Sequence, residues 1–301
     1  MNFRTEVHFI GESELCPTDE GDLVDQLKED FANYGKEMAD VRKHLEHWDE
    51  FINPYQRICA SIDVLRRDLE SLDLKPQDDA VPDLNHDTDM AEYQRQWTQV
   101  SERYSRGIGI CFGIRAMLPV RAESFINMLL FILMRSDVRR DQRLFDSVFR
   151  QQIDVRVKSL HLHCNGFRSP VEYSELTEFH SLMMNRNDLL HGNVSLDKLQ
   201  YGDVRFLGRV PIFTRYLSFW VRAHGVMLKN VGFEEWEDEL GVVESTEDYL
   251  LTLVDDEHRP FVEAALRARV LGTERSDNRL GVLFSEVLVD HKMGGTQEQP
   301  V

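Results

Sequence analysis

The segment MMNRNDLLHGN, residues 183–193, places an arginine, an asparagine and a histidine within one short stretch. His191 stands five residues after Arg186 and directly before Gly192, and Asn187 follows the arginine. A histidine titrates near neutral pH and can move protons, while an arginine can hold a phosphate as charge develops on its oxygens. The same spacing also suits the plain end of a helix, because a histidine in the last turn before a glycine is a common cap.

The Arg-x4-His spacing occurs three times in the chain, as RKHLEH at 42–47, RVKSLH at 156–161 and RNDLLH at 186–191. Arg42 and His47 fit the solvated side of an early helix. Arg156 is followed by a valine, which offers no polar support. Only Arg186 is followed by an uncharged polar residue, and only His191 precedes a glycine. The third copy is therefore the candidate site.

The spacing of the third copy predicts that the site needs two chains. On a helix, residues four apart differ by about 40° and residues five apart by about 140°. Asn187 and His191 then share a face, and Arg186 flanks that face. Two chains packed along this helix would bring two histidines and two arginines together in a cleft, so we expect a homodimer.

The elements that must position these residues are helices. A strongly apolar helix is predicted over 120–134, opened by Pro119, and it must lie at the centre of a bundle. Glu123 is its acidic residue, and a buried carboxylate needs partners, so we expect it near a backbone amide or a basic side chain such as Arg186. Further helices are predicted over 90–106, 140–163, 170–191 and 212–229. These make an all-α core packed against the helix that ends at His191, and a parallel sheet there would contradict it.

Two stretches of this core resemble the HEPN superfamily (higher eukaryotes and prokaryotes nucleotide-binding domain) over about residues 90–230. RAESFINMLLFIL at 121–133 is similar to the family's first core helix with its buried glutamate, and RNDLLHGN at 186–193 is similar to its RNx3H signature. The resemblance implies an antiparallel helical bundle and a metal-independent endoribonuclease that acts as a dimer in toxin or antiviral systems. Other members have lost catalysis and serve as assembly domains.

The resemblance also implies the roles of the site residues. Arg186 and His191 match the catalytic pair, Asn187 matches the polar residue beside the arginine, and Glu123 is the supporting carboxylate. The implied substrate is RNA, no cofactor or metal is needed, and an inhibiting or activating protein partner is expected. The alternatives are a catalytically inactive scaffold that assembles with a partner, and a small-ligand sensor, although no phosphate-binding loop is evident for the latter.

The segments outside the resemblance are predicted as follows. Residues 1–75 form a strand-like start and a long helical hairpin, residues 76–89 a linker, and residues 231–301 an acidic extension with short helices and one strand near 279–289. The first helix of the hairpin carries a heptad seam, and the second buries a row of aliphatic residues. The seam residues are Leu27, Phe31, Tyr34, Met38, Val41, Leu45, Trp48 and Ile52. The seam suits either packing within the chain or a coiled coil with a partner.

The formal net charge of -18 is the main objection to an RNA substrate, because it repels the phosphate backbone. Four arginines close together, Arg135, Arg139, Arg140 and Arg143, could offset that field locally and bind RNA, or could form an ordinary solvated helix face. The four cysteines have no CxxC spacing, which is typical of reduced thiols, and no metal site is expected. No apolar run approaches the roughly 20 residues that cross a bilayer, so we expect a cytoplasmic protein with no membrane contact.

Overall fold

The computed structural model describes residues 17–76, 79, 89–170, 175–191, 204–213, 224–276 and 280–281. Its helices are α1 (Pro17–Leu45), α2 (Pro54–Ser71), α3 (Met90–Leu133), α4 (Ser136–Arg140), α5 (Gln142–Phe149), α6 (Ile153–His163), α7 (Glu175–His191), α9 (Val226–Val231), α10 (Trp236–Thr252) and α11 (Arg259–Arg267). Its strands are β1 (Trp48–Ile52), β2 (Val204–Leu207), β3 (Val210–Phe213), β4 (Val270–Glu274) and β5 (Leu280–Gly281). The described chain is mostly helical, as expected, and every strand pair within it is antiparallel.

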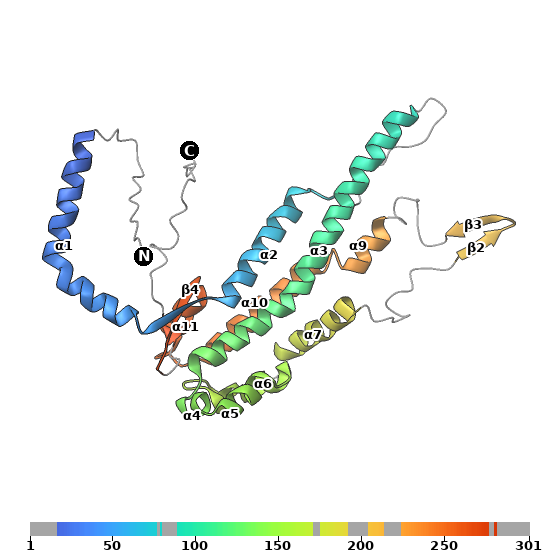
Figure 1. Cartoon of the computed structure of the whole chain (residues 1–301). Coiled ribbons are helices and arrows are strands. Elements are labelled where there is room, and N and C mark those ends of the chain that lie inside the picture. Colours follow the sequence, from blue (N-terminus) through green and yellow to red (C-terminus); the bar gives the residue numbers. More distant parts are fainter. Residues whose placement is uncertain are drawn as a thin grey trace.

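Helix α3 is the central element of the fold. Figure 1 shows it running through the middle of the molecule, and α2, α6, α7, α9, α10 and α11 all contact it. Its second half is buried almost continuously, from Leu118 to Leu133. Because the side chains around this helix come from both ends of the chain, one hydrophobic core includes α2, α7, α10 and α11. The changes of sequence pattern near residues 76–89 and 231 therefore do not interrupt the core.

The sequence reading split α3 into two helices, and that reading was wrong. Pro119 lies inside a single helix of 44 residues and is itself buried. A proline removes one backbone hydrogen bond, at a cost of about 3 kcal/mol in a helix interior. Leu118 and Ala122 on either side of the proline are buried, so tertiary packing outweighs that local penalty. Gly107 also lies inside α3, where a Cβ would collide with the side chain of Leu74, so the glycine lets the end of the α2 segment approach closely.

The predicted helical hairpin is also corrected. Helix α1 ends at Leu45, and the last two seam positions, Trp48 and Ile52, lie in strand β1, which pairs with β4 from Trp48↔Glu274 to Ile52↔Val270. This pairing joins residues more than 200 positions apart, so local periodicity could not reveal it. Helix α2 packs on α3, whereas α1 lies apart from α2 in Figure 1. Leu27 of the seam is exposed, and the seam's other side chains within α1 lie outside what the structure describes.

Several other boundaries differ from the expectation. The predicted helix over 140–163 is divided into α4, α5 and α6, and the predicted helix over 212–229 is replaced by the end of β3 and by α9, with 214–223 outside the described residues. Helix α7 agrees with the predicted helix over 170–191. Residues 171–174 and Gly192 lie outside the residues that the structure describes. The short helices expected in the tail are α10 and α11, and β5 is the described part of the expected strand.

Helix α3 is long and apolar enough to cross a membrane by length and composition, contrary to the sequence reading. That reading used the longest apolar run, residues 125–134 interrupted by Asn127, whereas a stretch of 18 residues in α3 is apolar on average. Within the structure, 61% of the most apolar stretch is buried, which matches a helix at the centre of a protein core. The cytoplasmic location remains an expectation.

Asn53 ties the two ends of the chain together. Its side-chain oxygen accepts hydrogen bonds from the backbone nitrogens of Tyr55 and Gln56 and so caps α2. Its side-chain nitrogen donates to the carbonyl oxygens of Ala265 at 2.9 Å and Ala268 at 2.8 Å, at the end of α11. The residue is completely buried, so all of these groups depend on it for hydrogen bonding.

We predict that Asn53→Ala lowers the free energy of unfolding by about 3 kcal/mol, because it removes a helix cap and leaves buried carbonyl groups unsatisfied. The matched control is Asp89→Ala, which removes the exposed cap of α3 and should cost about 1 kcal/mol. Urea denaturation followed by circular dichroism measures both. Equal losses would show that Asn53 acts only as a cap.

Burial also protects two thiols. It raises the pKa of Cys111 to about 11 and that of Cys164 to about 12. Burial also raises the pKa of Cys59, but this thiol is partly exposed whereas the other two are buried, so we predict that iodoacetamide at pH 8 modifies Cys59 at least tenfold faster in the native protein. Mass spectrometry of the alkylated peptides gives the rates, with urea-unfolded protein as the control in which all react alike. Rapid native labelling of Cys164 would contradict this packing.

Candidate functional site

Helix α7 carries the Arg186–His191 segment. Leu176, Phe179 and Leu182 are buried and recur every three residues, so this face of α7 packs against the body of the protein. Met184 points the other way, with 68% of its surface exposed. Arg186 lies on the buried flank, and its side chain is about a quarter exposed. The predicted packing of α7 against α3 is confirmed.

Glu123 of α3 lies between two arginines. Its Oε2 atom is 3.7 Å from Nη1 of Arg186 on α7, and its Oε1 atom is 3.3 Å from Nη1 of Arg156 on α6. The expected partner Arg186 is therefore present, and Arg156 is a second partner that the sequence reading did not assign. This carboxylate cluster, defined as Glu123, Arg156 and Arg186, joins three helices.

Arg156 is the most enclosed member of the carboxylate cluster, with 6% of its side chain exposed. Its Nη1 atom donates to Asn127 Oδ1 at 2.6 Å, and its Nη2 atom donates to the carbonyl oxygens of Phe149 and Gln151 at 2.7 and 2.8 Å. The RVKSLH copy of the motif was set aside because a valine follows its arginine, yet that arginine is a structural centre. The sequence contains one indication of this role: Asn127, one turn after Glu123 in an otherwise apolar helix, is a second polar residue that needs a partner.

The carboxylate cluster, which includes Arg186, carries a net positive charge. Two guanidinium groups share one carboxylate, so the three side chains together carry one net positive charge. The Nε atoms of Arg156 and Arg186 are buried and have no hydrogen-bond partner among the residues that the structure describes. Since Arg186 keeps part of its surface exposed, its remaining capacity can be used by an anion such as a phosphate.

Asn187 and His191 lie in the last two turns of α7, and their side chains lie outside what the structure describes. Helical geometry sets positions 187 and 191 along one face, together with Met184. Position 191 is about 140° around the helix from position 186, whose side chain faces α3. Within one chain, the arginine is thus directed to the bundle while the histidine position lies on another face.

The four arginines proposed to attract RNA do not act alike. Arg135 binds Asp137 at 2.8 Å, and Arg139 donates to the carbonyl oxygen of Phe131 at 2.7 Å while its guanidinium lies 5.5 Å from the centre of that ring. These two have structural contacts on α4. Arg140 and Arg143 are exposed. The local basic surface is therefore smaller than the sequence reading assumed.

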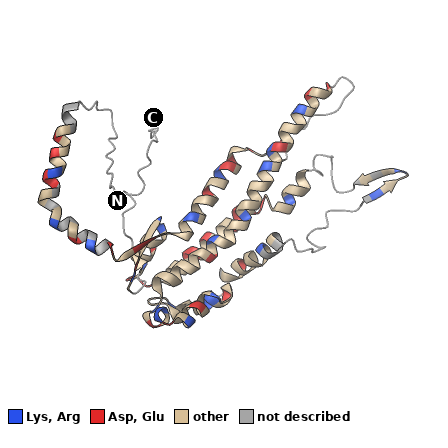
Figure 2. Cartoon of the chain, in the orientation of Figure 1, with Lys and Arg blue, Asp and Glu red and all other residues tan. Residues whose placement is uncertain are grey.

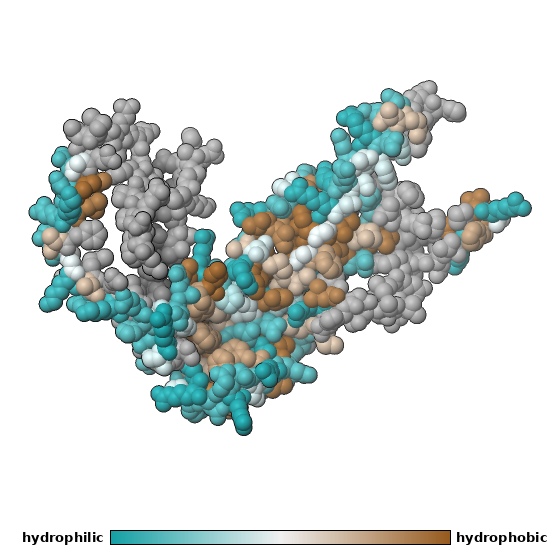
Figure 3. Space-filling view, in the orientation of Figure 1, coloured by the Kyte–Doolittle hydropathy of each residue, from teal (hydrophilic) through white to brown (hydrophobic). Residues whose placement is uncertain are grey.

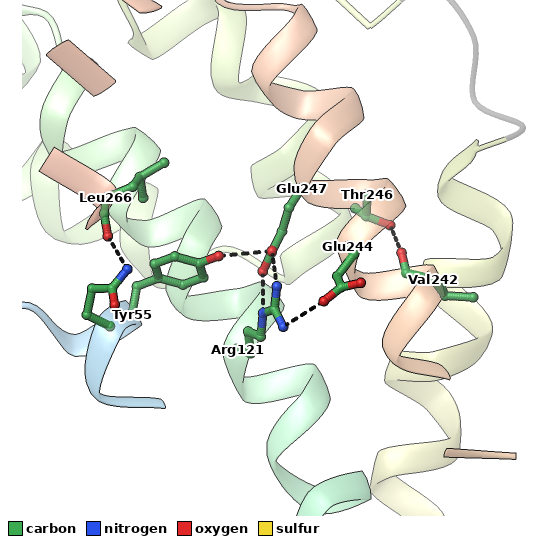
Figure 4. A network of polar contacts seen from close by, with 8 residues as sticks. Tyr55, Arg121, Val242, Glu244, Thr246, Glu247 and Leu266 are labelled. Atoms are coloured by element: carbon green, nitrogen blue, oxygen red, sulfur yellow. Dashed lines mark hydrogen bonds and ion pairs between the residues drawn. The ribbon is translucent and has the colours of Figure 1, made fainter. Parts of the chain in front are cut away.

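A second polar network, missed by sequence analysis, fixes α10 to α3 (Figure 4). Arg121 of α3 binds Glu247 at 2.6 Å and Glu244 at 3.4 Å, and Tyr55 of α2 donates to Glu247 at 2.9 Å. Burial raises the pKa of Glu247, and the hydrogen bonds from Arg121 oppose that rise. Arg115 similarly binds Glu239 of α10. The charged and polar groups of this network bind one another, so we interpret the network as structural.

Comparison of the chain with protein-family models, with curated proteins and with solved structures finds no match. Within the described residues, no group of three or more histidine, cysteine or acidic side chains is placed to hold a metal ion. The interpretation of the site therefore depends on the residues of this chain.

We predict that Arg156→Ala lowers the free energy of unfolding by about 3 kcal/mol. The substitution removes the buried cation that pairs with Glu123 and leaves two carbonyl groups without their hydrogen-bond donor. The matched control is Arg135→Ala, whose ion pair with Asp137 is largely exposed and should contribute less than about 1 kcal/mol. Urea denaturation measures both variants. Similar small losses would mean that the carboxylate cluster does not hold α6 and α7 in place.

Proposed function

We propose that this protein is a metal-independent endoribonuclease of the HEPN type, which cleaves RNA at a site shared by two copies of the chain. The observation that carries the proposal is the ion pair between Glu123 of α3 and Arg186 of α7. The resemblance implies a glutamate on the first core helix beside the arginine of an RNx3H segment, and in this chain that glutamate is about one third exposed.

The proposed reaction uses the 2′-hydroxyl of RNA. His191 takes the proton from that hydroxyl, the 2′ oxygen forms a bond to the adjacent phosphorus, and the bond from phosphorus to the 5′ oxygen breaks. An imidazolium returns a proton to the leaving oxygen. Arg186 stabilises the negative charge that builds on the phosphate oxygens, and Asn187 adds a polar contact beside it. The products carry 2′,3′-cyclic phosphates, and DNA is resistant because it lacks the nucleophile.

Two copies are needed because position 191 and Arg186 lie on different flanks of α7. A homodimer packed along α7 would bring the histidine of one copy toward the cluster of the other. The acidic chain opposes RNA binding, with a net charge of -18, so the cations of both copies would be needed at the cleft. A toxin or antiviral effector in the cytoplasm, restrained by an inhibiting protein or released by an activating partner, is the setting that the resemblance favours.

The alternative is a catalytically inactive HEPN-like scaffold that assembles with a protein partner. The acidic surface and the structural use of Arg139 and Arg156 favour it, since Arg139 donates to a backbone carbonyl and Arg156 is almost completely buried. A ligand sensor is the weaker alternative.

We predict that the purified protein cleaves single-stranded RNA in EDTA, and that Arg186→Ala and His191→Ala each reduce the rate at least a hundredfold, since each removes a group that acts on the phosphate or its proton. Gel electrophoresis of end-labelled RNA, with detection of 2′,3′-cyclic phosphate ends, measures this.

The matched controls are Arg42→Ala and His47→Ala, which alter the first copy of the same spacing and should leave the rate unchanged. Cleavage that survives in both site variants, or that stops in EDTA, would refute the assignment. A folded wild type that cleaves none of a panel of structured and unstructured RNAs would favour the scaffold.

A further inference from the structure

The β2–β3 hairpin is a separate, exposed element. Its strands pair with each other from Val204↔Phe213 to Leu207↔Val210, and no third strand joins this sheet in the described residues. Figure 1 shows it projecting from the helical body beyond the end of α7. Gly208 at the turn has φ +66°, a conformation that favours glycine and lets the chain reverse tightly.

The hairpin exposes apolar side chains on both faces. Phe206, Leu207 and Val210 are 67%, 73% and 63% exposed, among the highest values for large apolar residues in the described chain. Cross-strand pairs lie on one face, so Leu207 and Val210 share a face and Phe206 occupies the other. The brown atoms of the projecting hairpin are visible in Figure 3. Two strands alone are marginally stable in water, so an apolar surface of this kind needs a partner.

The positive charge of the hairpin indicates that its partner is acidic. Residues 204–213 contain Arg205 and Arg209 and no acid, in a chain whose net charge is -18 (Figure 2). A cationic, apolar arm therefore complements the acidic remainder of the same sequence. The exposed face of α7 offers an apolar contact surface at Met184, whereas the acidic Glu178 lies on another flank of the helix, about 120° around from Met184.

We infer that the β2–β3 hairpin is a dimerisation arm that packs on the exposed face of α7 in a second copy of this chain. This inference rests on the dimeric site proposed above. Met184 lies on the same helical face as positions 187 and 191, so an arm seated on Met184 brings Arg205 and Arg209 beside the proposed catalytic residues. The partner copy thereby supplies cations that the site lacks within one acidic chain.

The aliphatic content of the arm favours a protein partner over RNA. Among the side chains of the arm that the structure describes, Leu207, Val210 and Ile212 are exposed aliphatic residues and Phe206 is an exposed aromatic residue. RNA-binding surfaces rely on aromatic stacking and phosphate contacts, and aliphatic side chains add little to either.

The first experiment measures dimerisation of the full chain by sedimentation. Leu207→Ser with Val210→Ser should weaken the dimer at least tenfold, because it removes one apolar face of the arm. The matched control is Val64→Ser with Phe261→Ser, which replaces two exposed apolar residues of α2 and α11 and should leave the dimer unchanged. A wild type that is monomeric at all concentrations, or a dimer that the hairpin variant does not weaken, overturns the inference.

The second experiment locates the contact by disulfide cross-linking between differently tagged chains. One chain carries Leu207→Cys and the other Met184→Cys, both with Cys16→Ser and Cys59→Ser, since Cys111 and Cys164 are buried. The mixed disulfide should form in at least tenfold higher yield than between Met184→Cys and Val64→Cys. Hairpin-to-hairpin disulfides without the mixed product would overturn docking on α7.

The two proposals can fail separately. A cross-linked dimer that cleaves no RNA refutes the ribonuclease and leaves the arm in place, whereas an active enzyme without the mixed disulfide refutes only the arm. An RNA-binding hairpin would show the opposite pattern: Arg205→Glu with Arg209→Glu would abolish RNA binding, while the serine variants would leave the dimer intact. That pattern also overturns the inference.

Discussion

The charge of Glu123 on the apolar half of α3 is the constraint on which the arrangement of the helices depends. The Glu123 side chain is about one third exposed, yet it stands among buried residues of α3 and so still needs charged or hydrogen-bonding partners. Arg156 from α6 and Arg186 from α7 meet that need from two directions. The carboxylate therefore selects which two helices lie against this part of α3, and at what height along it. Any site on α7 inherits its position from that contact.

The same principle recurs along α3. Arg115 and Arg121 are held by acids of α10, and Tyr55 of α2 completes the second of these networks. Buried ion pairs add little net stability, since desolvation offsets most of the attraction, whereas a mismatched arrangement would leave charges unpaired. The apolar core supplies the stability, and the ion pairs specify which helix packs where. This division explains how four arginines can lie in or against an apolar core without weakening it.

The placement of Arg186 connects the fold to the proposed chemistry. The ion pair with Glu123 fixes the guanidinium from a neighbouring helix, and the shared carboxylate leaves the cluster positive. Preorganised positive charge is what a developing phosphate anion requires, and it is scarce in so acidic a chain. A partner copy that contributes a cationic arm would supply more of it, which relates the hairpin, the net charge and the proposed dimeric site to one another.

The sequence by itself determined the elements whose signals are local. The helix that ends at His191, its packing against the apolar helix that carries Glu123, and the need of Glu123 for a basic partner depend on local patterns or on a general rule of burial, and each agrees with the structure. The tertiary structure alone decided the strand at Trp48–Ile52, the continuity of α3 through Pro119, and the central role of Arg156. Trp48 and Ile52 are four residues apart, a spacing that fits a helix, and only pairing with β4 makes them a strand. Packing on both sides of Pro119 and a carboxylate 33 residues before Arg156 in the chain are likewise long-range contacts, which no local pattern contains.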